Sequence, residues 1–238
     1  MVHDGWGGIR FAVFSMSARS PEKLDAHYLE WHGLDHHPEQ YGIDSIRLGQ
    51  RWVSTEACRA VRAAEHGRFD DVDHVMQYLF ADPVEAGLQE FFDLGADLHA
   101  IGRMPLRLPP VELGGYELVE RYASPRVLVR DKVLPWRPAR GVYLVIERGK
   151  ERAELSTLCD VPGVAGAWRY HGGKFHERFA DTTDLTLTVC YLDEDVIATA
   201  LRLGTALTES WHGGSLVPLL AAPFETVTPW VWDRALPH

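Results

Sequence analysis

Cysteine is scarce in this chain, and long hydrophobic runs are missing from it. The three cysteines, Cys58, Cys159 and Cys190, are widely separated and odd in number. Such a set predicts reduced thiols in a cytoplasmic protein, not a disulfide framework or a zinc cage. No apolar run approaches the roughly 18 residues that a membrane-spanning helix needs, so we expect no membrane partner.

A basic surface is missing as well. The formal net charge is -10, and no cluster of Lys or Arg offsets it. Because phosphate binding needs positive charge, we expect no nucleic acid as a partner. Neither a GxGxxG motif nor a P-loop is present, so no nucleotide cofactor is expected. The first eleven residues lack the basic start and apolar core of a signal peptide, in keeping with a cytoplasmic location.

The composition is otherwise that of an ordinary globular protein, with 46% hydrophobic and 24% charged residues among 238. Its length allows one large domain or two small ones. An internal similarity favours two. When residues 71–123 are shifted by 113 positions, Tyr78 falls on Tyr191 and His99 on His212. We interpret this constant register as the trace of a duplication.

Hydrophobic periodicity predicts the order β-α-β-β-α-β in each half. Ser20 and Pro21 suggest where the first helix begins, because Ser is a good N-cap and Pro fits the first turn. The expected strands of the first half are 8–16, 43–54, 70–81 and 116–124, and its helices are 20–37 and 82–102. The expected strands of the second half are 140–148, 163–173, 184–194 and 229–236, with a long helix at 195–214.

This order predicts an α+β fold of tandem ferredoxin-like (βαββαβ) repeats that form an intramolecular α+β barrel. Residues 1–123 would form the N-terminal repeat, 124–139 the linker and 140–238 a degenerate C-terminal repeat. The first strands align at a larger shift, with Gly8 on Gly141. About 20 residues are therefore missing from the second copy, mostly where its first helix should be. The histidine-rich helix of the first half has no counterpart.

The stretch SPEKLDAHYLEWHGLDHH, followed by IDSIRLGQRWV, resembles the EthD-like branch of the dimeric α+β barrel superfamily. The resemblance implies that His32 takes the place of the motif's histidine, and that a fused chain closes the barrel by itself. Members of the superfamily include polyketide cyclases, dehydratases, decarboxylases, isomerases, cofactor-free monooxygenases and haem enzymes. Fold alone cannot choose among these activities.

A helical projection of residues 20–37 places Leu24, Tyr28, Trp31 and Asp35 on one stripe, flanked by His27. We expect this stripe to face the sheet across a pocket, with His32 on its shoulder. Imidazole exchanges protons near neutral pH, so the predicted catalytic residues are His32 or His27 as acid or base. Tyr78 or Arg51 would then stabilise an enolate.

The predicted substrate-binding residues are those expected to line the same pocket. His74, Met76 and Tyr78 share one face of their strand by the two-residue period. Aromatic walls would hold a flat apolar substrate, and a carboxylate could fix a histidine tautomer. The full set is Tyr28, Trp31, Asp35, Trp52, His74, Met76, Phe11 and Val13.

These residues predict a cofactor-independent lyase or isomerase that acts on a small hydrophobic, polyketide-like or ring-fission-like molecule. No cofactor and no metal site are predicted. Haem binding is one alternative, and a non-catalytic ligand-binding or scaffold role is another. A divalent metal is a third alternative, because His32 and His36 are spaced i,i+4 and Asp35, His74 or His99 could add a ligand. The segment HGGKFHERF (171–179) could form a lid, and homodimer formation is left open.

Overall fold

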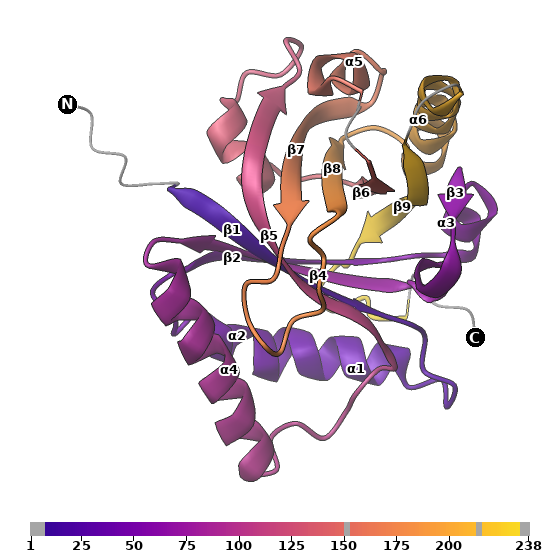
Figure 1. Ribbon diagram of the computed structural model, residues 1–238. Helices are drawn as coiled ribbons and strands as arrows, with labels where there is room; N and C mark the ends of the chain where they lie inside the picture. Colours follow the sequence, from indigo (N-terminus) through magenta and orange to yellow (C-terminus); the bar gives the residue numbers. More distant parts are fainter. Residues whose placement is uncertain (1–7, 150–152, 213–215, 234–238) are drawn as a thin grey trace.

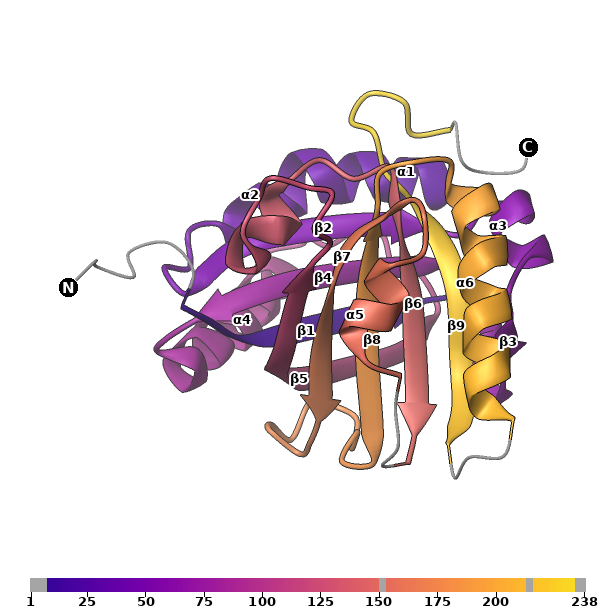
Figure 2. The same ribbon diagram turned by 90° about the horizontal axis from the view of Figure 1, so that it is seen from above.

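The computed structural model of the chain describes residues 8–149, 153–212 and 216–233. Within these residues, eight antiparallel strands close into a barrel in the order β2-β4-β1-β5-β7-β8-β6-β9, and β9 pairs back to β2. The short strand β3 pairs with β9 beside β2. Helices cover the barrel from outside (Figures 1 and 2). The prediction of an α+β barrel closed within one chain is thus confirmed.

The observed elements follow the expected order, with short additions after β2 and β5. The strands are β1 (Ile9–Ser17), β2 (Ile46–Val53), β3 (Ala64–Glu65), β4 (His74–Ala81), β5 (Pro110–Ala123), β6 (Gly141–Arg148), β7 (Val164–Gly172), β8 (Leu185–Leu192) and β9 (Val217–Thr226). The helices are α1 (Asp25–Trp31), π-helix η1 (His32–His36), α2 (His37–Gln40), α3 (Glu56–Ala60), 3-10 helix η2 (Gly67–Asp71), α4 (Val84–Ala100), 3-10 helix η3 (Asp131–Trp136), α5 (Leu155–Cys159) and α6 (Val196–Trp211).

The two halves of the barrel have the same strand order, β2-β4-β1-β5 in the first and β7-β8-β6-β9 in the second. β5 joins them, because its first part pairs with β1 and its second part, from Tyr116, pairs with β7. Figure 1 shows the strands of one half crossing the direction of those of the other. The boundaries 1–123, 124–139 and 140–238, and the descent of both halves from one repeat, stay predictions.

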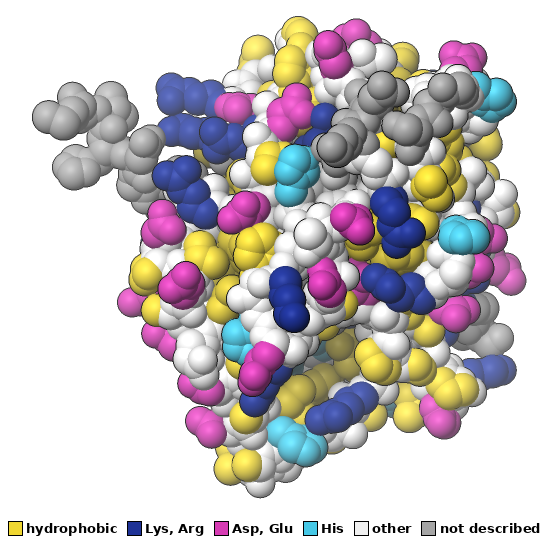
Figure 3. All heavy atoms as spheres, viewed as in Figure 1, with side chains coloured by type: hydrophobic (Ala, Val, Ile, Leu, Met, Phe, Trp, Pro, Cys, Tyr) yellow, Lys and Arg dark blue, Asp and Glu magenta, His cyan; other side chains and the backbone are white. Residues whose placement is uncertain are grey.

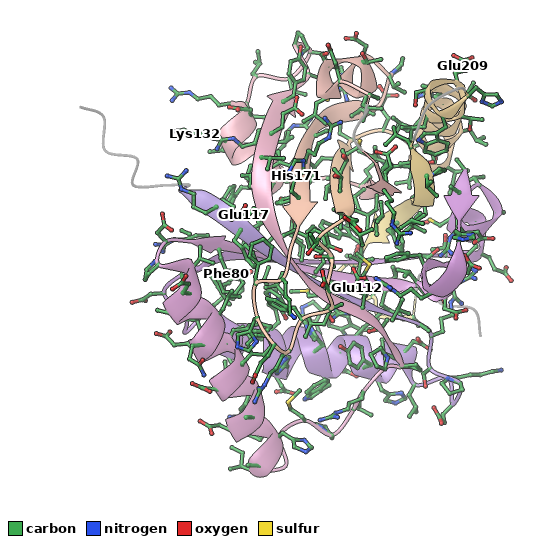
Figure 4. The ribbon with its side chains drawn as sticks, viewed as in Figure 1. Phe80, Glu112, Glu117, Lys132, His171 and Glu209 are labelled. Carbon is green, nitrogen blue, oxygen red and sulfur yellow. The ribbon has the colours of Figure 1, made fainter. Side chains whose placement is uncertain are left out.

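Successive side chains of each strand point alternately into two packing regions. One set fills the barrel interior, for example Phe14 of β1, Trp52 of β2 and Tyr170 of β7. The opposite set packs against the outer helices, where Phe80 of β4 lies beside α4 (Figure 4). The strands are therefore buried on both faces, which is why they read as nearly continuous apolar runs.

The shift of 113 residues that we used to align the two halves is wrong. A shift by an odd number of residues would align side chains on opposite faces of the corresponding strands. Tyr78 packs on the helix-covered face of β4, whereas Tyr191 points into the barrel interior. The shift that places Gly8 on Gly141 is odd too. Even-numbered residues of both β1 and β6, such as Phe14 and Leu144, face the interior. An even shift is needed in both places.

The last strand is also not where we expected it. β9 ends at Thr226, and Trp230 has φ 69°, a left-handed conformation that does not fit a strand. Residues 234–236 of the expected strand lie outside the described residues. Pro218 and Pro223 lie within β9 and hid it, since Pro usually argues against a central strand.

Two expectations about composition can be compared with the structure directly. Cys58, Cys159 and Cys190 are buried and unpaired. None of the helices in the described ranges is long and apolar enough to cross a membrane.

Candidate functional site

A cavity of about 820 Å³ lies against the outer face of β1, β2 and β4. The segment from α1 to α2 forms one wall, α4 forms another, and the chain that leads from α4 into β5 forms a third. Figure 3 shows a recess with apolar walls, edged by basic and histidine side chains, on the lower part of the molecule. The space predicted between the first helix and the sheet is therefore present.

The first helix presents a different face from the one we expected. It begins at Asp25 rather than at Ser20, whose backbone N–H donates to the Asp25 carboxylate. Its buried residues are Asp25, Leu29 and His32, whereas Leu24 is 39% exposed. Two of the three inward side chains are thus polar, while the apolar Leu24 points outward. The hydrophobic stripe is misleading here because the helix lines a polar site.

His32 is the most deeply buried imidazole in the cavity wall, with 3% of its surface exposed. Its Nε2 is 3.2 Å from the hydroxyl of Tyr78, which reaches it from β4. Burial, reinforced by the nearby positive charge of Arg51, holds the pKa of His32 well below its usual range. His32 is therefore neutral at physiological pH. Burial likewise raises the pKa of Tyr78, so its hydroxyl keeps its proton.

Arg51 enters the cavity from β2, where it alternates with the inward-facing Trp52. Its Nη2 donates to the hydroxyl of Tyr28 at 3.3 Å, and its guanidinium carbon lies 5.1 Å from the centre of the Tyr28 ring. Helix and sheet are thus linked across the cavity by a cation and an aromatic ring. The guanidinium is positioned to meet an oxygen of a bound molecule.

Asp25 and His74 form a buried pair behind the cavity wall. His74 Nε2 lies 2.8 Å from Asp25 Oδ1. Burial raises the pKa of Asp25, but its hydrogen bonds to His74 and to the Ser20 N–H outweigh burial, so the net pKa is lowered. Burial lowers the pKa of His74 more than Asp25 raises it. We conclude that an ionised Asp25 accepts from Nε2–H of a neutral His74.

Two further imidazoles extend this polar wall. The ring of His36 stacks on Trp31 at 5.3 Å and 18°, and its Nε2 is 3.2 Å from the Gln40 amide nitrogen. His37 packs over Gly49, at a distance that leaves no room for a Cβ there. Burial, then the charge of Arg51, lowers the pKa of His37 to about 4. The wall is therefore a set of uncharged imidazoles around one cation.

The second half of the chain supplies a cover for the cavity. The loop between β7 and β8 extends to the helices of the first half (Figure 1). His176 stacks on Phe92 of α4 at 4.3 Å, and Phe179 packs into the same aromatic cluster. Arg178 donates to the Phe92 carbonyl and lines the cavity. This loop contains residues 173–179 of the segment that the sequence suggested as a lid, whereas His171 and Gly172 belong to β7.

The structure brings together many of the residues predicted from the sequence and separates others. The prediction that Trp52 lines the cavity is wrong, because its side chain is 1% exposed and packs in the barrel interior. His27 and Asp35 do not face the sheet, because both are exposed on the outer side of the helix. Phe11, Val13 and His74 are buried and border the site without lining the cavity. The predicted residues that line it are Tyr28, Trp31, His32, Arg51, Met76 and Tyr78.

Several lining residues were missed. Phe91 and Phe92 form the α4 wall, and Gln40 extends the wall of the first helix beyond its expected end at residue 37. The pair Phe91-Phe92 inside an amphipathic helix was an available signal. Arg178 belongs to the other half of the chain, so only knowledge of the strand order could have placed it here.

The side chains present bear on the metal and haem alternatives. Within the described ranges, no three His, Cys, Asp or Glu side chains are grouped so as to hold a metal ion. Haem iron needs a free imidazole nitrogen. His36 cannot supply one, because its Nε2 is engaged with Gln40 and its Nδ1 is enclosed. His32 Nε2 is engaged with Tyr78, but the described contacts leave His32 Nδ1 unengaged, so haem stays an alternative.

Comparison with known proteins gives only distant likenesses. No family model matches the chain, and no curated protein does. Among solved structures, an anthrone oxidase-like protein is 10% identical over 94% of both chains, with a TM-score of 0.45. A chlorite dismutase variant from Candidatus Nitrospira defluvii, in complex with cyanide, is 11% identical over 91% of both chains, with a TM-score of 0.46. At such scores these likenesses do not assign an activity, so the function has to be inferred from the chain's own residues.

Proposed function

We propose that the chain is a cofactor-independent enzyme that moves a proton on a small, flat, enolisable molecule bound in the N-terminal cavity. The observation that carries this proposal is the neutral, buried His32, hydrogen-bonded to Tyr78, in the same cavity as the Arg51 guanidinium. A base that is uncharged at neutral pH, close to a cation that can receive developing negative charge, is what enolisation needs.

The proton movement balances within the site. If His32 donates Nε2–H to the Tyr78 oxygen, its Nδ1 carries the lone pair that takes a proton from a carbon next to a carbonyl group. The electron pair of that C–H bond moves onto the carbonyl oxygen, which Arg51 stabilises. Return of the proton to another carbon gives an isomer, and loss of a leaving group from the enolate gives a lyase reaction.

The low pKa of His32 sets a condition on this chemistry. Protonation of an imidazole beside Arg51 is unfavourable while the cavity holds no negative charge. An enolate formed in the same step supplies that charge, so imidazolium and enolate stabilise each other. The site therefore favours concerted proton transfer over prior protonation of the histidine.

The test measures exchange of carbon-bound hydrogen in a surrogate ketone, so the natural substrate need not be known. We would incubate the full chain with 2-tetralone, a flat aromatic ketone, in D₂O and follow loss of the α-proton signals by NMR. We expect exchange above the buffer rate, a loss of about 100-fold in His32→Gln, and a smaller loss in Tyr78→Phe. Equal exchange by wild type and His32→Gln, with both folded, would contradict the proposal.

The EthD-like assignment and a lyase or isomerase class are part of the same proposal, as is an aromatic or polyketide-like substrate. A ligand-binding or scaffold role is the main alternative. It would show as saturable binding of 2-tetralone with no exchange above background at any pH between 5 and 9. A Soret band in the purified protein would instead support the haem alternative.

A further inference from the structure

The inner part of the cavity contains a cation for which the described part of the chain supplies no counter-ion. Among the described residues, the Arg51 side chain makes one hydrogen bond, from Nη2 to the hydroxyl of Tyr28, and its Nε is buried without an acceptor. Arg51 is half-buried, and an enclosed donor without an acceptor, on a cation without a counter-ion, is unfavourable. A ligand that supplies the missing charge would relieve this cost.

The carboxylates near the cavity form no ion pair with Arg51 in the described part of the chain, and Glu22, which is exposed, accepts from the Ser20 hydroxyl. Asp25 accepts from His74 and from the Ser20 backbone. Glu112, whose side chain is fully buried where β5 begins (Figure 4), accepts from Arg68 and from the Tyr116 hydroxyl. Asp73 pairs with arginines on the other side of β4, namely Arg19, Arg59 and Arg62. None of these is free to neutralise Arg51.

The imidazoles that face Arg51 add no negative charge. The imidazoles of His32, His36 and His37 are held neutral first by burial and then by Arg51 itself, and His74 is neutral beside Asp25. Asp25 is the ionised carboxylate nearest to this wall, and its printed partners are His74 and the Ser20 backbone rather than Arg51. The titratable and charged groups that surround the guanidinium are Asp25, Tyr28, His32, His36, His37, His74 and Tyr78, with Glu22, His99, Arg107, Glu112 and Arg178 further out along the cavity.

We infer that the inner end of the cavity is an anion subsite, and that its ligand is an aromatic carboxylate whose two oxygens meet Arg51. A planar guanidinium binds a carboxylate through two parallel hydrogen bonds, which a single point charge cannot do. The rings of Tyr28 and Trp31, with Phe91 and Met76 beyond them, offer flat apolar walls to the ring of the ligand. This inference rests on the proposed function, whose substrate class it names.

Binding at this subsite would be coupled to proton uptake. A carboxylate at Arg51 removes the repulsion that holds the three imidazoles of the first helix uncharged, so their pKa values rise when it binds. One of them then takes up a proton, and affinity increases as the pH is lowered from 7.5 to 5.5. An uncharged ligand of the same shape would show neither effect.

The experiment compares 2-naphthoate with 2-naphthamide by isothermal titration calorimetry on the full chain. We expect wild type to bind the acid at least about 10-fold more tightly than the amide, because only the acid offers the charge. Arg51→Gln should remove this preference and leave amide binding within about twofold. Arg51→Lys should keep part of it. Arg47→Gln is the matched control, since Arg47 is exposed, lies earlier in β2, and does not line the cavity.

Titrations in buffers of different ionisation enthalpy report the proton uptake. Uptake with the acid in wild type, and its loss in Arg51→Gln, support the subsite. Equal binding of acid and amide by wild type, an undiminished preference in Arg51→Gln, or no binding of the acid at millimolar concentration would overturn it.

The anion subsite and the proposed activity can fail separately. Arg51-dependent binding of 2-naphthoate without exchange of 2-tetralone leaves the subsite standing and removes the enzyme. His32-dependent exchange without any preference for the acid does the reverse. His32→Gln should abolish exchange but keep the preference for 2-naphthoate, because Arg51 is unchanged in that variant.

Discussion

Asp25 and His74 connect the first helix to the sheet through one buried hydrogen bond of 2.8 Å. The pair fixes which face of the helix looks inward. His32 follows Asp25 by seven residues, close to two helical turns, and so lies on the same face. The hydrogen bond also leaves His74 Nδ1 without a partner, which is consistent with a neutral ring that donates only from Nε2. Asp25, which anchors the helix, and His32, the candidate base, thus lie on the same face of the helix.

Replacing Asp25 by Asn should weaken this anchor. The amide keeps the shape but loses the charge and offers one oxygen to two donors, so we expect a loss of about 1–3 kcal/mol in the free energy of unfolding at pH 7. Urea denaturation would measure it. The ¹⁵N shifts of the His74 ring should also move away from those of an Nε2–H tautomer. An unchanged His74 tautomer and an unchanged free energy of unfolding would show that Asp25 does not hold the His74 ring or anchor the helix.

The sequence predicted the elements of this region better than their orientation. Strand alternation grouped His74, Met76 and Tyr78 on one face, and that face does look toward the helix. The orientation of the helix was wrong because hydrophobic periodicity assumes that inward residues are apolar. Here Asp25, His32 and His36 point inward, since they belong to a polar site. Only a partner distant in sequence, such as His74, could have revealed this.

His27 and His32 should respond differently to substitution. His27 is exposed and does not line the cavity, so His27→Gln should keep the 2-tetralone exchange rate and the stability of wild type. His27 and His32 lie on the same stretch of helix, so a difference between the two variants would come from the side of the helix on which each residue lies. NMR exchange rates on the two purified variants decide the question. A loss of exchange in His27→Gln comparable to that in His32→Gln would contradict the assignment of the base.

The buried imidazoles predict a decline in stability at mildly acidic pH. The pKa of His37 is about 4 in the folded chain, and those of His32, His36 and His74 are also lowered, against about 6.5 when unfolded. Between these values the unfolded chain binds more protons, so the free energy of unfolding falls as the pH falls below 6.5. Each histidine contributes up to about 1.4 kcal/mol per pH unit.

His37→Gln isolates one contribution to this slope. Its loss of stability between pH 6.5 and 4 should be smaller than that of wild type, by denaturant titrations at each pH. Asp25 does not interfere in this window. Its lowered pKa adds stability above about 3.8, which is lost only below that pH. Equal slopes in both proteins would mean that His37 titrates as it does in the unfolded chain.

Two glycines test the packing of the cavity wall. A Cβ on Gly49 would lie 2.0 Å from His37 Nε2 and 2.9 Å from Met76 Cε, so Gly49→Ala should displace His37 and cost about 1–3 kcal/mol. Gly95, on the α4 wall, has nothing within 4 Å of its Cβ position. Gly95→Ala should therefore stabilise α4 by about 0.5–1 kcal/mol, through helix propensity. Thermal unfolding of both variants gives the comparison. A milder effect at Gly49 than at Gly95 would be incompatible with this packing.

Phe179 tests how firmly the loop between β7 and β8 is held. It is 7% exposed and its ring lies 5.2 Å from that of Phe92. Phe179→Ala should cost about 3 kcal/mol and release the loop. Limited proteolysis should then cut within residues 173–184 before the rest of the chain. Unchanged protection of this segment would show that other contacts are sufficient to hold it.

The second half of the chain shows where sequence patterns fail for a different reason. Strands β6, β7 and β8 were predicted within two residues of their observed ends, because their apolar runs are bounded by polar turns. β9 was missed, since Pro218 and Pro223 interrupt it while PWVWD further on reads as a strand. Partners on both sides, β6 together with β2 and β3, stabilise β9 in spite of its prolines.

The closed strand order has a consequence for dissecting this protein. A fragment that ended before the linker would leave the second part of β5 without β7, and β2 without β9, so two strand edges would be open to aggregation. It would also lose Arg178 and Phe179 from the rim of the cavity. Co-expression of the separated halves should therefore restore ligand binding where neither half alone does. In the intact chain every described wall of the cavity comes from one polypeptide, so no second copy of the chain is needed to build that lining.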